Sequence, residues 1–122
     1  MRIDAATIIE RRKREQRDLL GRAERFAAQL APALGVRAVI VFGSVARGDF
    51  NVWSDIDVLV VAEHLPDRLS DRLDALGDLP SLVQPVAWTP EELRRQLARA
   101  NPIAREALDR GVWLVGSGSE VR

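Results

Sequence analysis

Two short apolar runs in the middle of the chain, the first of them continuous and the second beginning inside an Asp-Ile-Asp motif, restrict the folds that it can adopt. Ala38–Phe42 and Ile56–Ala62 are rich in β-branched residues and lack the polar alternation of a half-exposed strand. Such runs are typical of strands that are buried on both faces of a sheet. Gly43 ends the first run, 44–48 is predicted to be a tight turn or one helical turn, and 49–54 carries turn-forming residues. The chain is therefore predicted to fold around a buried sheet.

The rest of the sequence alternates helical and strand patterns around these two runs. Apolar residues at helical spacing, with Pro and Gly as stop signals, predict helices, and shorter apolar runs predict strands. The predicted elements are a long N-terminal helix over 5–34 closed by Pro32 and Gly35, a helix over 66–76, a strand over 82–88, a helix that starts at Thr89, a helix over about 103–110, and a strand over 112–115. Pro85 favours an edge position or a bulge for the 82–88 strand. The Gly/Ser-rich tail 116–122 is predicted to be frayed. This pattern indicates one α/β (or α+β) domain over residues 1–122, with about four strands and a core over 36–115.

Composition limits the function classes that are open to the chain. With 122 residues, of which 47% are apolar, it can bury one core but not two. Eighteen basic and 18 acidic residues give no net charge, which argues against a nucleic-acid partner. The absence of cysteine excludes disulfides and thiolate metal sites. No apolar run reaches the 18 residues of a membrane span, and the charged N-terminus does not resemble a signal peptide, so a cytoplasmic protein is expected.

Asp55 and Asp57 suggest a metal site at the start of the second apolar run. Side chains alternate along a strand, so carboxylates two residues apart project to the same side. A cation relieves their repulsion, and oxygen ligands of this kind suit Mg²⁺ with substrate phosphates in its shell. The Gly43-Ser44 turn could present backbone N–H groups and a hydroxyl to a phosphate, with Arg47 one turn further on. Ser44 could equally be a helix N-cap, and Arg47 a surface ion-pair partner.

The segments Phe42–Gly48 and Ser54–Val61 resemble the signature of the DNA polymerase β-like nucleotidyltransferase superfamily, and the short chain resembles its minimal nucleotidyltransferase (MNT) branch. The resemblance extends over about 36–115. It implies a palm-like fold with a mixed sheet flanked by helices, and transfer of a nucleoside monophosphate, AMP from ATP, onto a hydroxyl with release of pyrophosphate. It also implies that Asp55 and Asp57 hold two Mg²⁺ ions. Gly43 and Ser44 would bind the β- and γ-phosphates, and Arg47 would add a phosphate contact.

One position departs from the family pattern. Active members carry a third carboxylate five residues before a threonine that corresponds to Thr89, and this chain has Gln84 there. An amide oxygen can ligate a metal, but it carries no charge and cannot act as a general base. Removal of the acceptor's proton would then fall to water, to the substrate or to another group such as Glu63.

Two classes of function follow from the resemblance. As an enzyme, the chain is similar to MNT antitoxins that act on a HEPN-family toxin encoded nearby and transfer AMP to a tyrosine hydroxyl of that toxin. This reading fits a chain too small to carry its own acceptor-binding domain. As a binding module, a chain with Gln84 would bind nucleotide, transfer it weakly or not at all, and neutralise its partner by occlusion. The sequence leaves the nucleotide, the acceptor and the formation of homo- or hetero-oligomers open.

Overall fold

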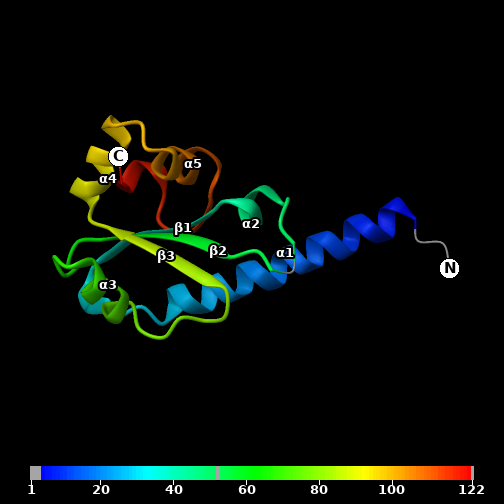
Figure 1. Cartoon of the computed structure of the whole chain (residues 1–122), viewed down its shortest axis with the longest axis horizontal. Coiled ribbons are helices and arrows are strands. Elements are labelled where there is room, and N and C mark those ends of the chain that lie inside the picture. The colour runs from blue at the N-terminus through cyan, green and yellow to red at the C-terminus, as the bar shows by residue number, and fades with distance from the viewer. Residues whose placement is uncertain (1–3, 52, 122) are drawn as a thin grey trace.

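The computed structural model describes residues 4–51 and 53–121, and this part of the chain forms a four-stranded mixed sheet flanked by helices (Figure 1). The strand order is β3-β2-β1-β4. β1 pairs antiparallel with both β2 and β4, whereas β2 and β3 run parallel. The elements are α1 (Ala5–Ala28), η1 (Pro32–Leu34), β1 (Val36–Phe42), α2 (Ser44–Arg47), β2 (Ile56–Ala62), α3 (Leu69–Ala75), β3 (Val83–Trp88), α4 (Pro90–Ala98), α5 (Pro102–Arg110), β4 (Val112–Val115) and α6 (Gly118–Val121). The predicted fold class, with its four strands, is confirmed.

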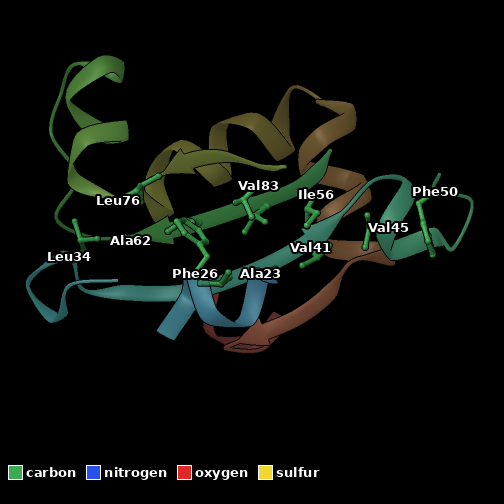
Figure 2. Close-up of a cluster of buried hydrophobic side chains, with 13 residues drawn as sticks. Ala23, Phe26, Leu34, Val41, Val45, Phe50, Ile56, Ala62, Leu76 and Val83 are labelled. Carbon is green, nitrogen blue, oxygen red and sulfur yellow. The ribbon is translucent and has the colours of Figure 1, made fainter. Parts of the chain in front are cut away.

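The two central strands are buried on both faces over most of their length, as their apolar runs predict, with Arg37 and Asp57 as the polar exceptions. One face of β1 and β2 packs against Ala23 and Phe26 of α1 and against Leu76 at the end of α3 (Figure 2). The opposite face packs against α4, α5 and α6 through a second apolar cluster that includes Leu93, Ala104 and Val121. Each helix removes apolar surface of the sheet from water, which is the main stabilising term of such a three-layer arrangement.

The strand with a proline lies at an edge of the sheet. β3 pairs only with β2 within the described sheet, and the register runs without a shift through Val58 and Pro85. A proline has no N–H to donate, so an edge position costs the sheet no hydrogen bond. The sequence left an edge position or a bulge open for this strand, and the edge position is the one observed.

The first helix is shorter than predicted. α1 ends at Ala28 with Gln29 as its C-cap, and Pro32–Leu34 forms a separate 3-10 turn, so a continuous helix over 5–34 is wrong. Pro32 lacks the N–H that would bond to the Ala28 carbonyl, and its ring clashes with that group. Ala31, the residue before the proline, is extended at φ −65° and ψ 135°. Gln29 instead donates to the carbonyls of Leu76 and Asp78, which ties this bend to the end of α3.

The end of the described chain is also more ordered than predicted. Gly118–Val121 forms the short helix α6, and Val121 is 2% exposed within the second apolar cluster. A frayed tail over 116–122 is therefore wrong for residues 118–121, while residue 122 lies outside the described residues. The Gly/Ser composition predicted fraying, but burial of a single valine supplies enough apolar contact to dock this turn.

α3 presents leucines to solvent and buries an arginine. Leu69 and Leu73 are exposed, whereas Arg72 is 6% exposed. The Arg72 guanidinium donates to the carbonyls of Pro66 and Ala87 and to the Glu92 carboxylate, at 2.6, 3.0 and 2.8 Å. Arg68 is extended at φ −78° and ψ 134° and forms the N-cap, so α3 begins at Leu69, and the predicted start at residue 66 is wrong. Among the described helices, none is long and apolar enough to cross a membrane.

Candidate active site

The residues of the Gly43-Ser44 and Asp55-Ile56-Asp57 motifs meet at one end of the sheet. Gly43 directly follows β1, and Asp55 directly precedes β2. In the sheet register Phe42 lies opposite Asp57, and Asp57 lies opposite Gln84 on β3. The end of β1 and the beginnings of β2 and β3 therefore bring together residues from three separate parts of the sequence.

Asp57 and Gln84 project to the sheet face that α4 and α5 cover. Along β2, Ile56, Val58 and Val60 belong to the cluster under α1, whereas Leu59 and Val61 belong to the cluster under α4 and α5. Since side chains alternate, Asp57 lies on the same face as Leu59. Residues that pair in adjacent strands share a face, so Gln84 lies beside Asp57. The position with an amide in place of a third carboxylate is thus next to Asp57 in space.

Gly43 is a position at which no other residue fits. Its backbone has φ 77° and ψ −154°, a conformation that is essentially restricted to glycine. A Cβ built on Gly43 would lie 2.4 Å from Oδ2 of Asp57. The Asp57 carboxylate therefore lies directly against the glycine backbone, in the space that a side chain would occupy.

The turn after Gly43 forms the helix α2, with Gly43 itself at the N-cap position. Ser44 is the first helical residue, so the interpretation of Ser44 as the N-cap is wrong. The earliest intrahelical bonds run from the N–H groups of Arg47 and Gly48 to the carbonyls of Gly43 and Ser44. By helix geometry, the N–H groups of the first residues have no partner inside the helix. Such groups can face an anion beside Asp57.

Arg47 makes ion pairs with two carboxylates. Its Nε donates to Asp49 at 3.2 Å, and its Nη1 donates to Glu106 of α5. Hydrogen bonds to Asp49 and then to Glu106 raise the pKa of Arg47 above its ordinary value. The surface ion pair that the sequence left open is thus present, and it connects α2 to α5 beside the glycine turn. Arg47 and Glu106 also line a surface depression of about 360 Å³ together with Pro102, Arg105, Asp109 and Arg110.

α1 fixes the segment between α2 and β2. Arg12 donates to the carbonyls of Gly48 and Phe50, and its guanidinium lies 3.9 Å from the centre of the Phe50 ring. Gln16 donates to the carbonyl of Val45 in α2 at 2.8 Å. Asn51 then closes a side-chain turn, in which its Oδ1 accepts from the Trp53 N–H and its own N–H bonds to Ser54 Oγ. This segment sets the approach of the chain to Asp55, while Trp53 itself is 85% exposed.

The carboxylates at this end of the sheet repel one another. Partial burial of Asp57, repulsion by Asp55 and repulsion by Glu106 raise the pKa of Asp57, and Arg47 opposes this effect. A bound cation would remove this repulsion. In the described residues no group of three or more His, Cys, Asp or Glu side chains could hold a metal, so Asp55 and Asp57 would form at most a partial set of ligands. This partial set fits Mg²⁺, which keeps several waters and takes further oxygens from substrate phosphates.

Two other acidic residues, Glu63 and Glu106, differ in their distance from this end of the sheet. Glu63, which the sequence left open as a base, follows the opposite end of β2 and pairs with Arg37, so it lies away from Asp57. Glu63 lies six residues beyond Asp57 along the chain, and a strand rises by about 3.3 Å per residue. Glu106 was missed by the sequence reasoning, because no motif connects a helical glutamate to a strand 49 residues earlier in the chain. Only the packing of α5 over the sheet brings Glu106 to Arg47.

Comparisons with known proteins agree with this architecture. Residues 20–114 match the family model described as "Nucleotidyltransferase domain". A relative from Methanocaldococcus jannaschii, named "Putative protein adenylyltransferase", is 48% identical over 42 residues, which make up 34% of this chain and only 29% of that relative.

Two solved structures share the fold at low sequence identity. The crystal structure of a "putative nucleotidyltransferase" from Sulfolobus solfataricus has a TM-score of 0.63 at 23% identity and covers 84% of each chain. A crystal structure of a toxin-antitoxin with AMP-PNP has a TM-score of 0.55 at 22% identity and covers 79% of this chain and 75% of that one.

Proposed function

The chain belongs to the nucleotidyltransferase domain family, and from this premise we propose that it is a metal-dependent enzyme that transfers AMP from ATP onto a hydroxyl of a partner protein. The observation that carries the proposal is the contact between the Asp57 carboxylate and the backbone of Gly43, with the start of α2 directly beside it. A metal ligand and a set of backbone donors then face the same small volume. A triphosphate with its cation needs both.

Each residue of the motif has a role in this proposal. Asp55 and Asp57 bind two Mg²⁺ ions. Gly43 and Ser44 bind the β- and γ-phosphates. Arg47 contributes a guanidinium to the phosphates, for which its planar fork is well suited. A metal ion held by these carboxylates would lower the pKa of the attacking hydroxyl and neutralise charge on the leaving phosphate. The repulsion that raises the pKa of Asp57 supports this assignment, because a bound cation would relieve it.

The acceptor in this proposal is a tyrosine hydroxyl of a HEPN-family toxin that is encoded nearby, and the chain acts as its antitoxin in the cytoplasm. The chain has no tyrosine of its own, so modification of a tyrosine requires a second protein. A structural neighbour of the same fold is part of a toxin-antitoxin with AMP-PNP, and a partial relative is named for protein adenylylation. These likenesses support a toxin as the class of partner and an adenine nucleotide as the substrate of this proposal.

A specific observation favours a second function, that of a nucleotide-binding antitoxin without efficient transfer. Gln84 lies beside Asp57 in the sheet register, where active family members have a charged residue. A chain that binds nucleotide there could neutralise its partner by occlusion alone. The two functions differ in a single measurable quantity, which is the rate of transfer.

Calorimetric titration of Mg²⁺-ATP and an assay of labelled AMP transfer onto the co-purified partner test the proposal. We expect Mg²⁺-dependent binding and labelling of the partner in the wild type. The Asp55→Asn, Asp57→Asn double variant should keep its fold and lose both. Binding without any labelling would favour the occlusion function, and transfer that persists in the double variant would refute the site assignment.

A further inference from the structure

We propose that Glu106 supplies the carboxylate that Gln84 lacks and accepts the proton of the acceptor hydroxyl during transfer, an assignment that rests on the proposed function above. Glu106 belongs to α5, which packs across the same sheet face that carries Asp57 and Gln84. Its neighbours Ala104, Ala107 and Leu108 are buried against that face. Glu106 is directed instead to Arg47, at the end of the sheet where the glycine turn lies.

Other acidic residues are less suited to this role. Glu63 is at the opposite end of β2, and Asp55 and Asp57 are committed to the cation in the proposed function. Asp49 also pairs with Arg47, but its side chain is 64% exposed against 31% for Glu106. Asp49 is thus directed mainly to solvent, whereas Glu106 is the more enclosed of the two and belongs to the helix that covers the Asp57 face of the sheet. Glu106 pairs with Arg47, and the backbone N–H of Arg47 bonds to the carbonyl of Gly43, so Glu106 is held one helical turn from the glycine that contacts Asp57.

The ion pair with Arg47 gives the Glu106 carboxylate two states, one paired with the guanidinium and one released from it. Without nucleotide, Nη1 of Arg47 bonds to Glu106 while Nε bonds to Asp49. A triphosphate competes with Glu106 for the guanidinium, which has five donors and can keep Asp49 while it turns Nη1 to a phosphate oxygen. The Glu106 carboxylate then loses its ion pair and becomes available as a proton acceptor only when nucleotide is present.

The step balances with the nucleoside triphosphate as the only co-reactant. The acceptor hydroxyl gives its proton to the Glu106 carboxylate, and its oxygen forms a bond to the α-phosphorus. The bond between the α-phosphorus and the bridging oxygen breaks, and pyrophosphate leaves with that electron pair. Glu106 afterwards returns the proton to solvent and can pair with Arg47 again.

The test compares Glu106→Gln with Glu63→Gln, which removes a glutamate from an equivalent ion pair with Arg37 at the far end of β2. Glu106→Gln should lower the transfer rate by about 10²- to 10⁴-fold, the range for loss of a general base. Its affinity for Mg²⁺-ATP should stay within about fivefold of wild type, since an exposed ion pair contributes at most ~1 kcal/mol. Glu63→Gln should transfer at the wild-type rate, and a thermal melt checks that both variants fold.

A rescue variant separates catalysis from positioning of Arg47. Adding Gln84→Glu to Glu106→Gln restores a carboxylate next to Asp57, and we expect it to recover transfer without restoring the Arg47 ion pair. The assignment is overturned if Glu106→Gln transfers at the wild-type rate, if its loss is fully explained by weaker nucleotide binding, or if the rescue variant stays as slow. A wild-type protein that binds Mg²⁺-ATP and does not transfer would overturn the proposed function itself, and with it this assignment.

Discussion

Replacing Gly43 with alanine should damage the site more than it damages the fold. The residue has φ 77° and ψ −154°, so a side chain there costs about 1–3 kcal/mol of strain. For a domain of this length, each kcal/mol lowers the Tm by roughly 3–6 °C. The added methyl group would start 2.4 Å from Asp57 Oδ2, and it needs at least 3.0 Å, so the carboxylate must move by about 0.6 Å or more.

That displacement should appear mainly in metal-dependent chemistry. Mg²⁺ requires near-ideal geometry, and a misplacement on the order of 1 Å in an active site can cost about 10²-fold in rate. We therefore expect Gly43→Ala to lose about 10²-fold in AMP transfer and to bind Mg²⁺-ATP more weakly. Calorimetry, labelled-AMP transfer and a thermal melt on the same preparation give the three quantities.

Gly48→Ala is the matched control for backbone strain. Gly48 also has a positive φ of 92°, but an added Cβ would meet only Gln16 Nε2, at 3.9 Å. This variant should lose about 1 kcal/mol of stability and keep its nucleotide affinity. If Gly43→Ala loses stability and yet binds and transfers like wild type, or if both variants lose affinity equally, the proposed contact between Gly43 and Asp57 is not what shapes the site.

Three further predictions concern stability. Burial, and then repulsion by Asp55 and Glu106, raises the pKa of Asp57. The metal-free protein should therefore lose stability as the pH rises from the ordinary value of 3.8 through the pKa of Asp57 in the folded state. In thermal melts with EDTA, Asp57→Asn should remove this loss, and it should also remove the rise in Tm that Mg²⁺ causes. If the Tm of Asp57→Asn depends on pH as the wild-type Tm does, the titration of Asp57 is not the cause of that dependence. Burial raises the pKa of Glu92, but hydrogen bonds from Thr89 and Arg72 outweigh it and lower the pKa, so this carboxylate should stabilise the protein above pH 4.5 and less as the pH falls through its folded pKa. Glu92→Gln should cost about 1–3 kcal/mol in urea unfolding, because buried Arg72 loses its charged partner, and a smaller change would mean that the pair is solvated. Val121→Ala should cost about 1–2 kcal/mol if α6 is docked, and nothing if it is frayed.

Much of the sheet could be predicted because its signals are local. Ala38–Phe42 is apolar at every position and Ile56–Ala62 at every position but Asp57, which is typical of strands covered on both faces. Pro85 favoured an edge position or a bulge, of which the edge position is observed, and the predicted helix start at Thr89 agrees with its place as N-cap of α4, where it forms a capping box with Glu92. The predictions that proved wrong concern element ends, such as α1 beyond Ala28. There Pro32 stops the helix locally, and Gln29 then bonds to the carbonyls of the distant residues Leu76 and Asp78.

The sequence by itself determined the components of the candidate site: a glycine turn after one buried strand, two aspartates at the start of the next, and an amide at the third position. These depend on spacing along a strand, which is fixed by backbone geometry. Only the tertiary structure decided that Asp57 lies against Gly43, that Gln84 lies beside Asp57, that Glu63 is at the wrong end of the sheet, and that Glu106 holds Arg47. The reason is that strand register and helix docking join residues tens of positions apart, and the packing that selects them leaves no local pattern in the chain.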